Sequence, residues 1–142
     1  MAVAPVPAAV GARRRARERA LCLLYEAESK QVEPGDVMAG LPVAPEPYAV
    51  KLVDGVAGDA TDIDGWLRRY ARDWALERMP AVDRALLRIA VFELLRRPDV
   101  PTGVVLAEAV ELASRYSTED SARFVNGVLA AIAAEARPLT SA

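Results

Sequence analysis

Apolar residues recur at spacings of three and four along almost every patterned stretch of this 142-residue chain. Around residues 47–57 and 82–94, this spacing places the apolar side chains on one face of a helix. No stretch shows a convincing alternation of apolar and polar residues with the period of two that indicates a half-buried strand. We therefore predict an all-α protein, a compact bundle of about six to seven helices joined by short connections.

Prolines and short polar segments divide the chain into these helices. Pro47 and Pro80 each mark a predicted helix start, because a residue in the first turn needs no backbone N–H donor. The predicted helices cover about residues 12–29, 36–41, 47–57, 61–74, 80–97, 102–116 and 119–136. Thr102 is a candidate N-cap. We expect residues 1–11 to be a disordered lead, residues 12–136 to form one domain, and residues 137–142 to be a tail.

Five arginines fall within residues 13–19, at the predicted start of the first helix. The positive end of the helix dipole favours acids there, and each cation should cost ~0.3–1 kcal/mol. The overall net charge of −2 conceals this local cluster. A negative partner outside the fold would explain it, and a nucleic-acid phosphate backbone is the first candidate. A solvated, frayed helix end is the alternative interpretation.

The residue inventory disfavours most catalytic chemistry. The chain has no histidine and a single cysteine, Cys22, and it contains no glycine-rich phosphate-binding motif. The usual general base and the usual metal ligand are therefore missing from the sequence. We predict a protein that is not an enzyme and needs no cofactor or metal, with Cys22 a half-buried, inert thiol. One cysteine and no long apolar run also predict a cytoplasmic location.

The aromatic residues are of two kinds. Trp66, Tyr70 and Trp74 recur at a spacing of four, which is typical of a stripe that faces the core. Tyr25 lies opposite the apolar face of the first predicted helix. An aromatic ring in that position can stack on an unpaired base, although spacing alone does not distinguish this role from an ordinary surface tyrosine.

Three stretches of the chain carry recognisable sequence motifs. They are the basic stretch of residues 13–25, the stretch VDRALLRIAVFELL of residues 82–95, and residues 99–129, whose most specific part is EDSARFVNGVL at 119–129. Together these stretches resemble the NusB family of transcription antitermination factors, across about residues 12–135.

The resemblance implies a fold of two stacked helical bundles without catalytic activity or a cofactor. It also implies binding to the boxA element of ribosomal RNA leader transcripts together with NusE, a small-subunit ribosomal protein. The resulting complex joins RNA polymerase and suppresses premature termination. Self-association occurs in some relatives, so a homodimer is one expected state.

Matching the family motifs to this chain also implies individual site residues. The RNA-side residues would be Arg13, Arg14, Arg15, Arg17, Tyr25, Asp120, Arg123, Phe124 and Asn126. The NusE-facing surface would involve the helix of residues 82–95 and its neighbours, with Asp83 and Glu93 as acidic partners for a basic protein.

The chain departs from the family pattern in two places. Ala107 stands where many relatives have Asn, and the proline-rich residues 31–47 match no family motif.

Two other functions are compatible with the residues alone. One is a helical protein-interaction module that uses Trp66 or Tyr70 and binds no RNA. The other is an RNA-positioning domain that serves a separate RNA-modifying polypeptide.

Overall fold

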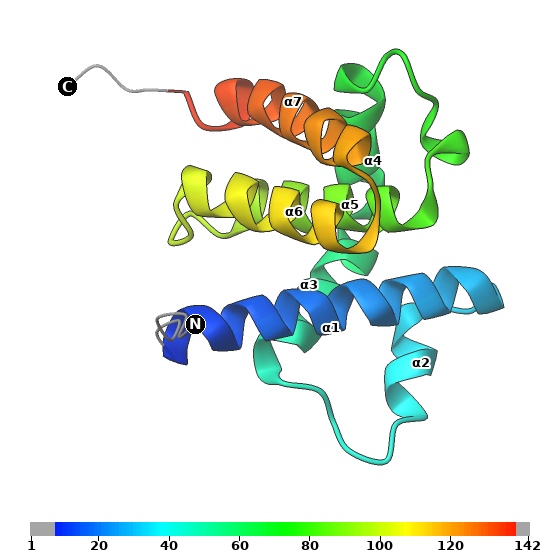
Figure 1. Ribbon diagram of the computed structural model, residues 1–142. Coiled ribbons are helices and arrows are strands. Elements are labelled where there is room, and N and C mark those ends of the chain that lie inside the picture. The colour runs from blue at the N-terminus through cyan, green and yellow to red at the C-terminus, as the bar shows by residue number, and fades with distance from the viewer. Residues whose placement is uncertain (1–7, 139–142) are drawn as a thin grey trace.

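The structure is a computed structural model that describes residues 8–138. That part of the chain contains α-helices and one 3₁₀ turn, and no strand. The helices, labelled in Figure 1, are α1 (Ala8–Lys30), α2 (Pro34–Ala39), α3 (Pro47–Gly58), α4 (Ala60–Tyr70), α5 (Ala81–Arg96), α6 (Thr102–Tyr116) and α7 (Glu119–Ala136), with the 3₁₀ turn at Leu76–Arg78. The predicted all-α class is confirmed. None of the helices within residues 8–138 has the length and apolar character needed to cross a membrane.

The helices form two stacked sub-bundles, as Figure 1 shows. Helices α1–α3 make one sub-bundle and α4–α7 make the other, and both α1 and α3 pack on α5. Helix α5 is buried on most of its sides, with Leu86, Leu87 and Val91 among its core residues. A helix that is largely buried all round has to satisfy every charged group that it carries. Helix α5 carries two buried carboxylates, Asp83 and Glu93.

Helix α1 begins earlier than the sequence pattern predicts. It starts at Ala8 rather than at Ala12, so the arginines of residues 13–19 lie beyond its first turn. The dipole effect falls off within the first turn of a helix. The penalty that we expected for these arginines is therefore wrong, and their clustering needs another explanation. Residues 1–7 of the predicted lead lie outside the described part of the chain.

The end of α1 is closed by backbone hydrogen bonds of the Schellman type. Gln31 takes the left-handed conformation, with φ of 56°, that glycine usually supplies at this position. Its N–H donates to Glu28 O at 3.1 Å, and the N–H of Val32 donates to Ala27 O at 3.0 Å. The chain thereby turns sharply into α2 instead of continuing past Lys30.

Gly55 lets α3 lie close against α5. A Cβ atom at this position would stand 2.2 Å from Cε1 of Phe92, which is closer than real atoms approach. Any larger residue would therefore push the two helices apart. This close packing also places the first turn of α3, which carries Tyr48, on the side of α5 that α1 covers.

Arg137 belongs to the fold and not to a tail. Its guanidinium donates hydrogen bonds to carbonyl groups at the end of α5 and in the α5–α6 connection, where helix carbonyls lack intrahelical partners. The acceptors are Glu93 O, Leu94 O, Arg97 O, Val100 O and Thr102 Oγ1, at 2.6–3.2 Å. Thr102 is the first residue of α6 and Pro101 occupies the N-cap position, so the predicted Thr102 cap is wrong.

The three aromatic residues predicted to face the core all pack against it, but only two of them lie on α4. Trp66 and Tyr70 stack on each other, with ring centroids 6.2 Å apart, and both pack against the core. Helix α4 ends at Tyr70, however, so Trp74 lies in the linker to α5. There it forms an edge-to-face pair with Phe124 of α7, at 5.2 Å between centroids.

Candidate nucleic-acid interface

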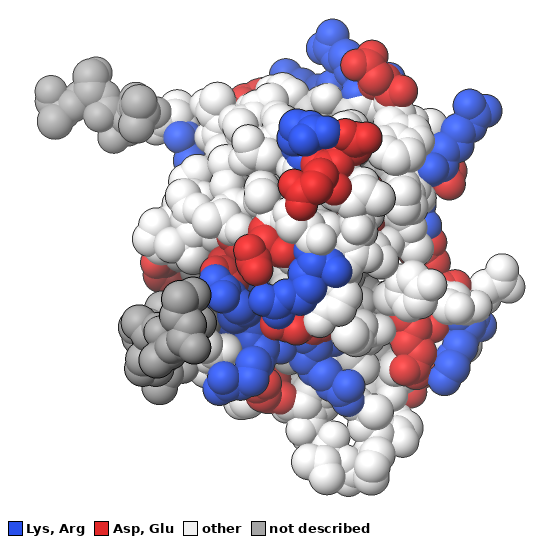
Figure 2. Space-filling view, in the orientation of Figure 1, with Lys and Arg blue, Asp and Glu red and all other residues white. Residues whose placement is uncertain are grey.

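The arginine-rich stretch of α1 divides into residues that hold the fold together and residues that face outward. Figure 2 shows Lys and Arg side chains gathered over the N-terminal half of α1, with carboxylates among them. Helix α1 packs on α3 and α5, and those helices bring acidic and aromatic partners to its inner face. The number of arginines in the sequence therefore overstates the number that an RNA molecule can reach.

Arg17 is an internal residue. Its side chain donates two hydrogen bonds to the Glu93 carboxylate, at 2.9 and 2.8 Å, and Tyr48 donates a third from its hydroxyl at 2.6 Å. Arg17 is 4% exposed and Glu93 is 1% exposed. Burial raises the pKa of Tyr48 to about 12, and its hydrogen bond to Glu93 adds to the shift. The predicted roles of Arg17 as a phosphate contact and of Glu93 as a partner contact are therefore wrong.

Arg14 is held by a second carboxylate. It donates two hydrogen bonds to Glu108 of α6, at 3.0 and 2.8 Å, and Arg17 approaches the same carboxylate at 4.0 Å. Glu108 is buried, whereas Arg14 is partly exposed. The hydrogen bonds from Arg14 hold the pKa of Glu108 below its ordinary value. Arg14 thus lies at the edge of the accessible surface, and two of its N–H groups already donate to Glu108.

The lowered pKa of Glu108 makes stability depend on pH. A group whose pKa is lower in the folded state stabilises the fold above its unfolded pKa, and this contribution disappears as pH falls through the folded pKa. We expect the free energy of unfolding to fall between about pH 5 and pH 3, and Glu108→Gln to flatten that dependence. Urea denaturation across this range measures it. Glu111→Gln, exposed on the same helix, is the control; an unchanged slope in Glu108→Gln would contradict the expectation.

Three arginines remain on the outer surface of α1. Arg13 lies over the Tyr48 ring, with its guanidinium carbon 3.9 Å from the ring centroid, and it is partly buried. Arg15 and Arg19 are exposed, and within residues 8–138 neither is paired with a carboxylate. Arg19 was not among the residues predicted for RNA. Its orientation away from the apolar stripe was the available signal, because an outward direction is what a phosphate contact requires.

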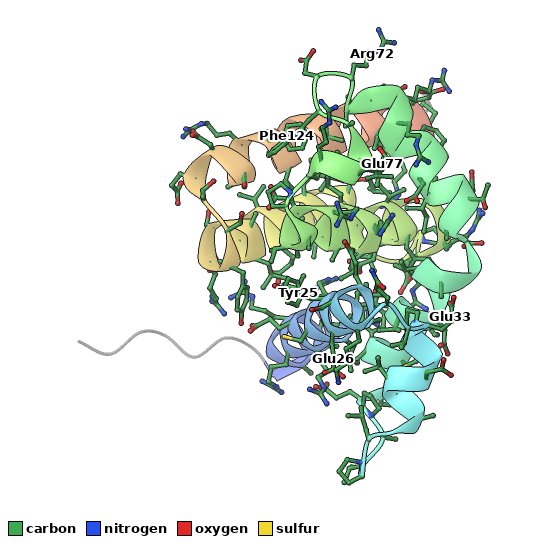
Figure 3. All side chains as sticks on the ribbon, turned by 90° about the vertical axis from the view of Figure 1, so that its right-hand side faces the viewer. Tyr25, Glu26, Glu33, Arg72, Glu77 and Phe124 are labelled. Carbon is green, nitrogen blue, oxygen red and sulfur yellow. The ribbon has the colours of Figure 1, made fainter. Side chains whose placement is uncertain are left out.

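Tyr25 is exposed on α1, as predicted, with 47% of its surface accessible. Cys22, one turn before it, is also exposed rather than half-buried. Figure 3 shows Tyr25 on α1 and Phe124 on α7, in different layers of the molecule. Because Phe124 is half-buried against Trp74, Tyr25 is the exposed ring of the two.

The start of α7 presents the second group of predicted RNA residues. Thr118 caps the helix by accepting a hydrogen bond from the N–H of Ser121 at 3.0 Å. Asp120, Arg123 and Asn126 are exposed, and Asp120 pairs with Arg123 one turn along the helix. Phe124 is half-buried because it packs on the linker tryptophan. The polar members of this group are therefore accessible.

Asp83 of α5 contacts the first turn of α7 from inside the protein. It is fully buried and accepts a hydrogen bond of 2.7 Å from the Ser121 hydroxyl. Its predicted contact with a partner protein is therefore wrong, because the side chain points into the protein. Its observed role is to connect the first turn of α5 to the first turn of α7.

The exposed groups are suited to binding a nucleic acid. Guanidinium groups such as those of Arg15 and Arg19 bind phosphates, and an exposed ring such as that of Tyr25 can stack on a base. Within residues 8–138, no three His, Cys, Asp or Glu residues are placed to hold a metal ion. Exposed cations of this kind can contact a nucleic-acid backbone, and exposed polar and aromatic groups can contact unpaired bases.

Comparisons with known proteins identify one family. Residues 14–134 match the model of the NusB family. The transcription antitermination protein NusB of Acidothermus cellulolyticus is 48% identical over 136 residues, covering 92% of both chains. That of Beutenbergia cavernae is 49% identical over 134 residues, covering 84% of this chain and 88% of the relative.

Solved structures with the same fold include two that bear on the site. NusB of T. maritima matches with a TM-score of 0.79 and 34% identity, covering 87% of this chain and 91% of that one. A structure of the antitermination factors NusB and NusE in complex with double-stranded RNA matches with a TM-score of 0.72 and 30% identity. That alignment covers 87% of this chain and 97% of the other.

Proposed function

The chain belongs to the NusB family, and from this membership we propose that it is a transcription antitermination factor that binds RNA together with NusE. The observation that carries the proposal is the outer face of α1. Arg15 and Arg19 are exposed there without carboxylate partners among the described residues, on the same helix as the exposed Tyr25. A stable helix needs none of these three side chains in that position, whereas an RNA strand uses all of them.

The RNA target that we propose is the boxA element of ribosomal RNA leader transcripts. Arg15 and Arg19 would take the main phosphate contacts, and Arg13 and Arg14 would contribute from the edge of the same surface. Phosphate contacts supply affinity without sequence information. Sequence would be read by Tyr25 and by the group at the start of α7, which comprises the exposed Asp120, Arg123 and Asn126 and the half-buried Phe124.

NusE needs a different surface from the one predicted, since Asp83 and Glu93 are buried. A groove of about 600 Å³ lies where α1, α3, α4 and α5 meet, and Glu28, Glu33 and Glu77 line it. Figure 3 shows Glu33 and Glu77 on one side of the molecule. Arg68, Arg84 and Arg88 also line the groove, and Glu28 pairs with Arg84 and Glu77 with Arg68. Glu33 is the lining carboxylate that has no ion-pair partner among residues 8–138, so it would meet a basic group of the ribosomal protein. The groove also adjoins α5, which the family resemblance implies for this contact. Bound to both partners, the protein would act in the cytoplasm within an RNA polymerase complex that resists premature termination.

Joint binding tests this function. We expect the protein and NusE together to bind boxA RNA at least roughly tenfold more tightly than either alone, because each partner adds RNA contacts to a single complex. Fluorescence anisotropy at fixed salt measures the three affinities, with a scrambled RNA of equal length as the control. Equal affinity for boxA and scrambled RNA, or no gain from NusE, would contradict the proposal.

A further inference from the structure

A hollow of about 480 Å³ lies beside α1, bounded by the start of α5 and the end of α6. Leu21 and Val82 form part of its apolar wall. Tyr25 and Tyr116 both line it, and Glu26 and Lys30, which form an ion pair of 3.0 Å, are also among its residues. Of the residues assigned to RNA in the proposed function, only Tyr25 lines this hollow.

The two tyrosines are notable for their exposure. Tyr25 is 47% exposed and Tyr116 is 44% exposed, and they are the only strongly exposed aromatic side chains within residues 8–138. Tyr116 is held in place, because its hydroxyl donates a hydrogen bond of 2.7 Å to Glu18, which also accepts one of 3.1 Å from Arg115. A ring fixed in advance loses little conformational entropy when a ligand contacts it.

The position of the hollow along α1 relates it to the free cations. At 100° per residue, Arg15, Arg19, Cys22 and Ser29 lie on the same side of the helix, and the last two line the hollow. At ~1.5 Å of rise per residue, Arg19 precedes Cys22 by only ~4.5 Å along the helix axis. A phosphate on Arg19 would therefore lie next to the mouth of the hollow.

We propose that this hollow receives one unstacked base of the bound RNA, with Tyr25 and Tyr116 contacting the base while Arg19 holds a neighbouring phosphate. The inference rests on the proposed function and adds Tyr116 to its site. The apolar, ring-lined wall suits the π-face of a base, whereas the groove where α1, α3, α4 and α5 meet is lined mainly by ion pairs. Tyr116 ends α6 just before α7, so the hollow also connects the α1 surface with the α7 group.

An abasic scan of the RNA tests the pocket. Each nucleotide of single-stranded boxA RNA is replaced in turn by an abasic residue, and affinity is measured for the wild type, Tyr116→Leu and Tyr116→Phe, each in complex with NusE. We expect one abasic position to weaken wild-type binding by at least about fivefold, the lower end of what one stacked base contributes. Tyr116→Leu should weaken binding of intact RNA by a similar factor, without changing the salt slope, and should be insensitive to that abasic position.

Tyr116→Phe separates the ring from its hydroxyl. It keeps the stacking surface and loses only the hydrogen bond to Glu18. We therefore expect the same abasic position to weaken its binding as in the wild type, although intact RNA binds somewhat more weakly because the ring is no longer fixed in advance. The same profile in Tyr116→Leu as in the wild type would overturn the pocket alone. The pocket would also be overturned if Tyr116→Leu weakened NusE binding and left RNA binding unchanged, because the hollow would then belong to the contact with the protein partner. Failure of the wild-type complex to bind RNA would overturn the proposed function together with the pocket.

Discussion

Replacing Arg17 with methionine is expected to lower the free energy of unfolding by about 3–5 kcal/mol, the usual cost of breaking one side of a buried ion pair. The substitution leaves the Glu93 carboxylate buried with Tyr48 as its remaining side-chain donor. A carboxylate in that position must either be protonated or draw water into the packing between α1 and α5. Chemical denaturation followed by circular dichroism measures the loss.

The matched control is Arg15→Met, two residues earlier on the same helix. Arg15 is exposed and, among the described residues, unpaired, so its loss should change stability by no more than about 0.5 kcal/mol. The double substitution Arg17→Met with Glu93→Leu should recover part of the loss, because neither charge then remains buried alone. A cost for Arg17→Met no larger than that for Arg15→Met would show that the pair does not hold α1 to α5.

The double variant Arg15→Gln/Arg19→Gln is expected to weaken RNA binding by on the order of 100-fold at low salt. Each lost contact is a hydrogen bond to a charged group, worth ~1.5 kcal/mol or more. The slope of log affinity against log salt should also fall by about 1.4, because two phosphate contacts on a single strand release about that many counterions. Anisotropy titrations across a salt series measure both quantities.

The control for this variant removes the same number of positive charges from another part of the surface. Lys51→Gln/Arg78→Gln removes two exposed cations that lie outside the proposed RNA surface. We expect little change in the salt slope for this control. Similar losses in both double variants would mean that RNA responds to overall charge and not to the α1 face. Arg14 is unsuitable for such a test, because removing it also leaves Glu108 without its main partner.

Most of the helical framework could be predicted because its signals are local. Helices α3 and α6 begin at Pro47 and Thr102, as the apolar spacing and the prolines indicate, and α5 ends at Arg96 before Pro98. The errors lie at two helix ends. Helix α1 begins at Ala8, directly after Pro7, although residues 8–11 carry no apolar stripe. Helix α4 stops at Tyr70 without a local breaker, although the aromatic spacing continues.

Part of the site was also predictable. Tyr25 and Asn126 are exposed, as their positions off the apolar faces indicate. The roles of Arg17, Asp83 and Glu93 were not predictable, because a charged residue on a helix normally faces solvent. Arg17 and Glu93 are 76 positions apart in the chain, so no periodicity connects them.

The sequence by itself thus determined the all-α class, most of the helix boundaries and the presence of a cationic segment on α1, since these depend on residues within a few turns of one another. Only the tertiary structure decided which cations are available. Packing α1 against α5 and α6 brings Glu93 and Glu108 to Arg17 and Arg14, and two of the five arginines are thereby neutralised internally. The same packing brings Tyr116 beside Tyr25 and forms a hollow that no single segment contains. Long-range contacts set both outcomes, because burial and pairing are properties of the assembled surfaces.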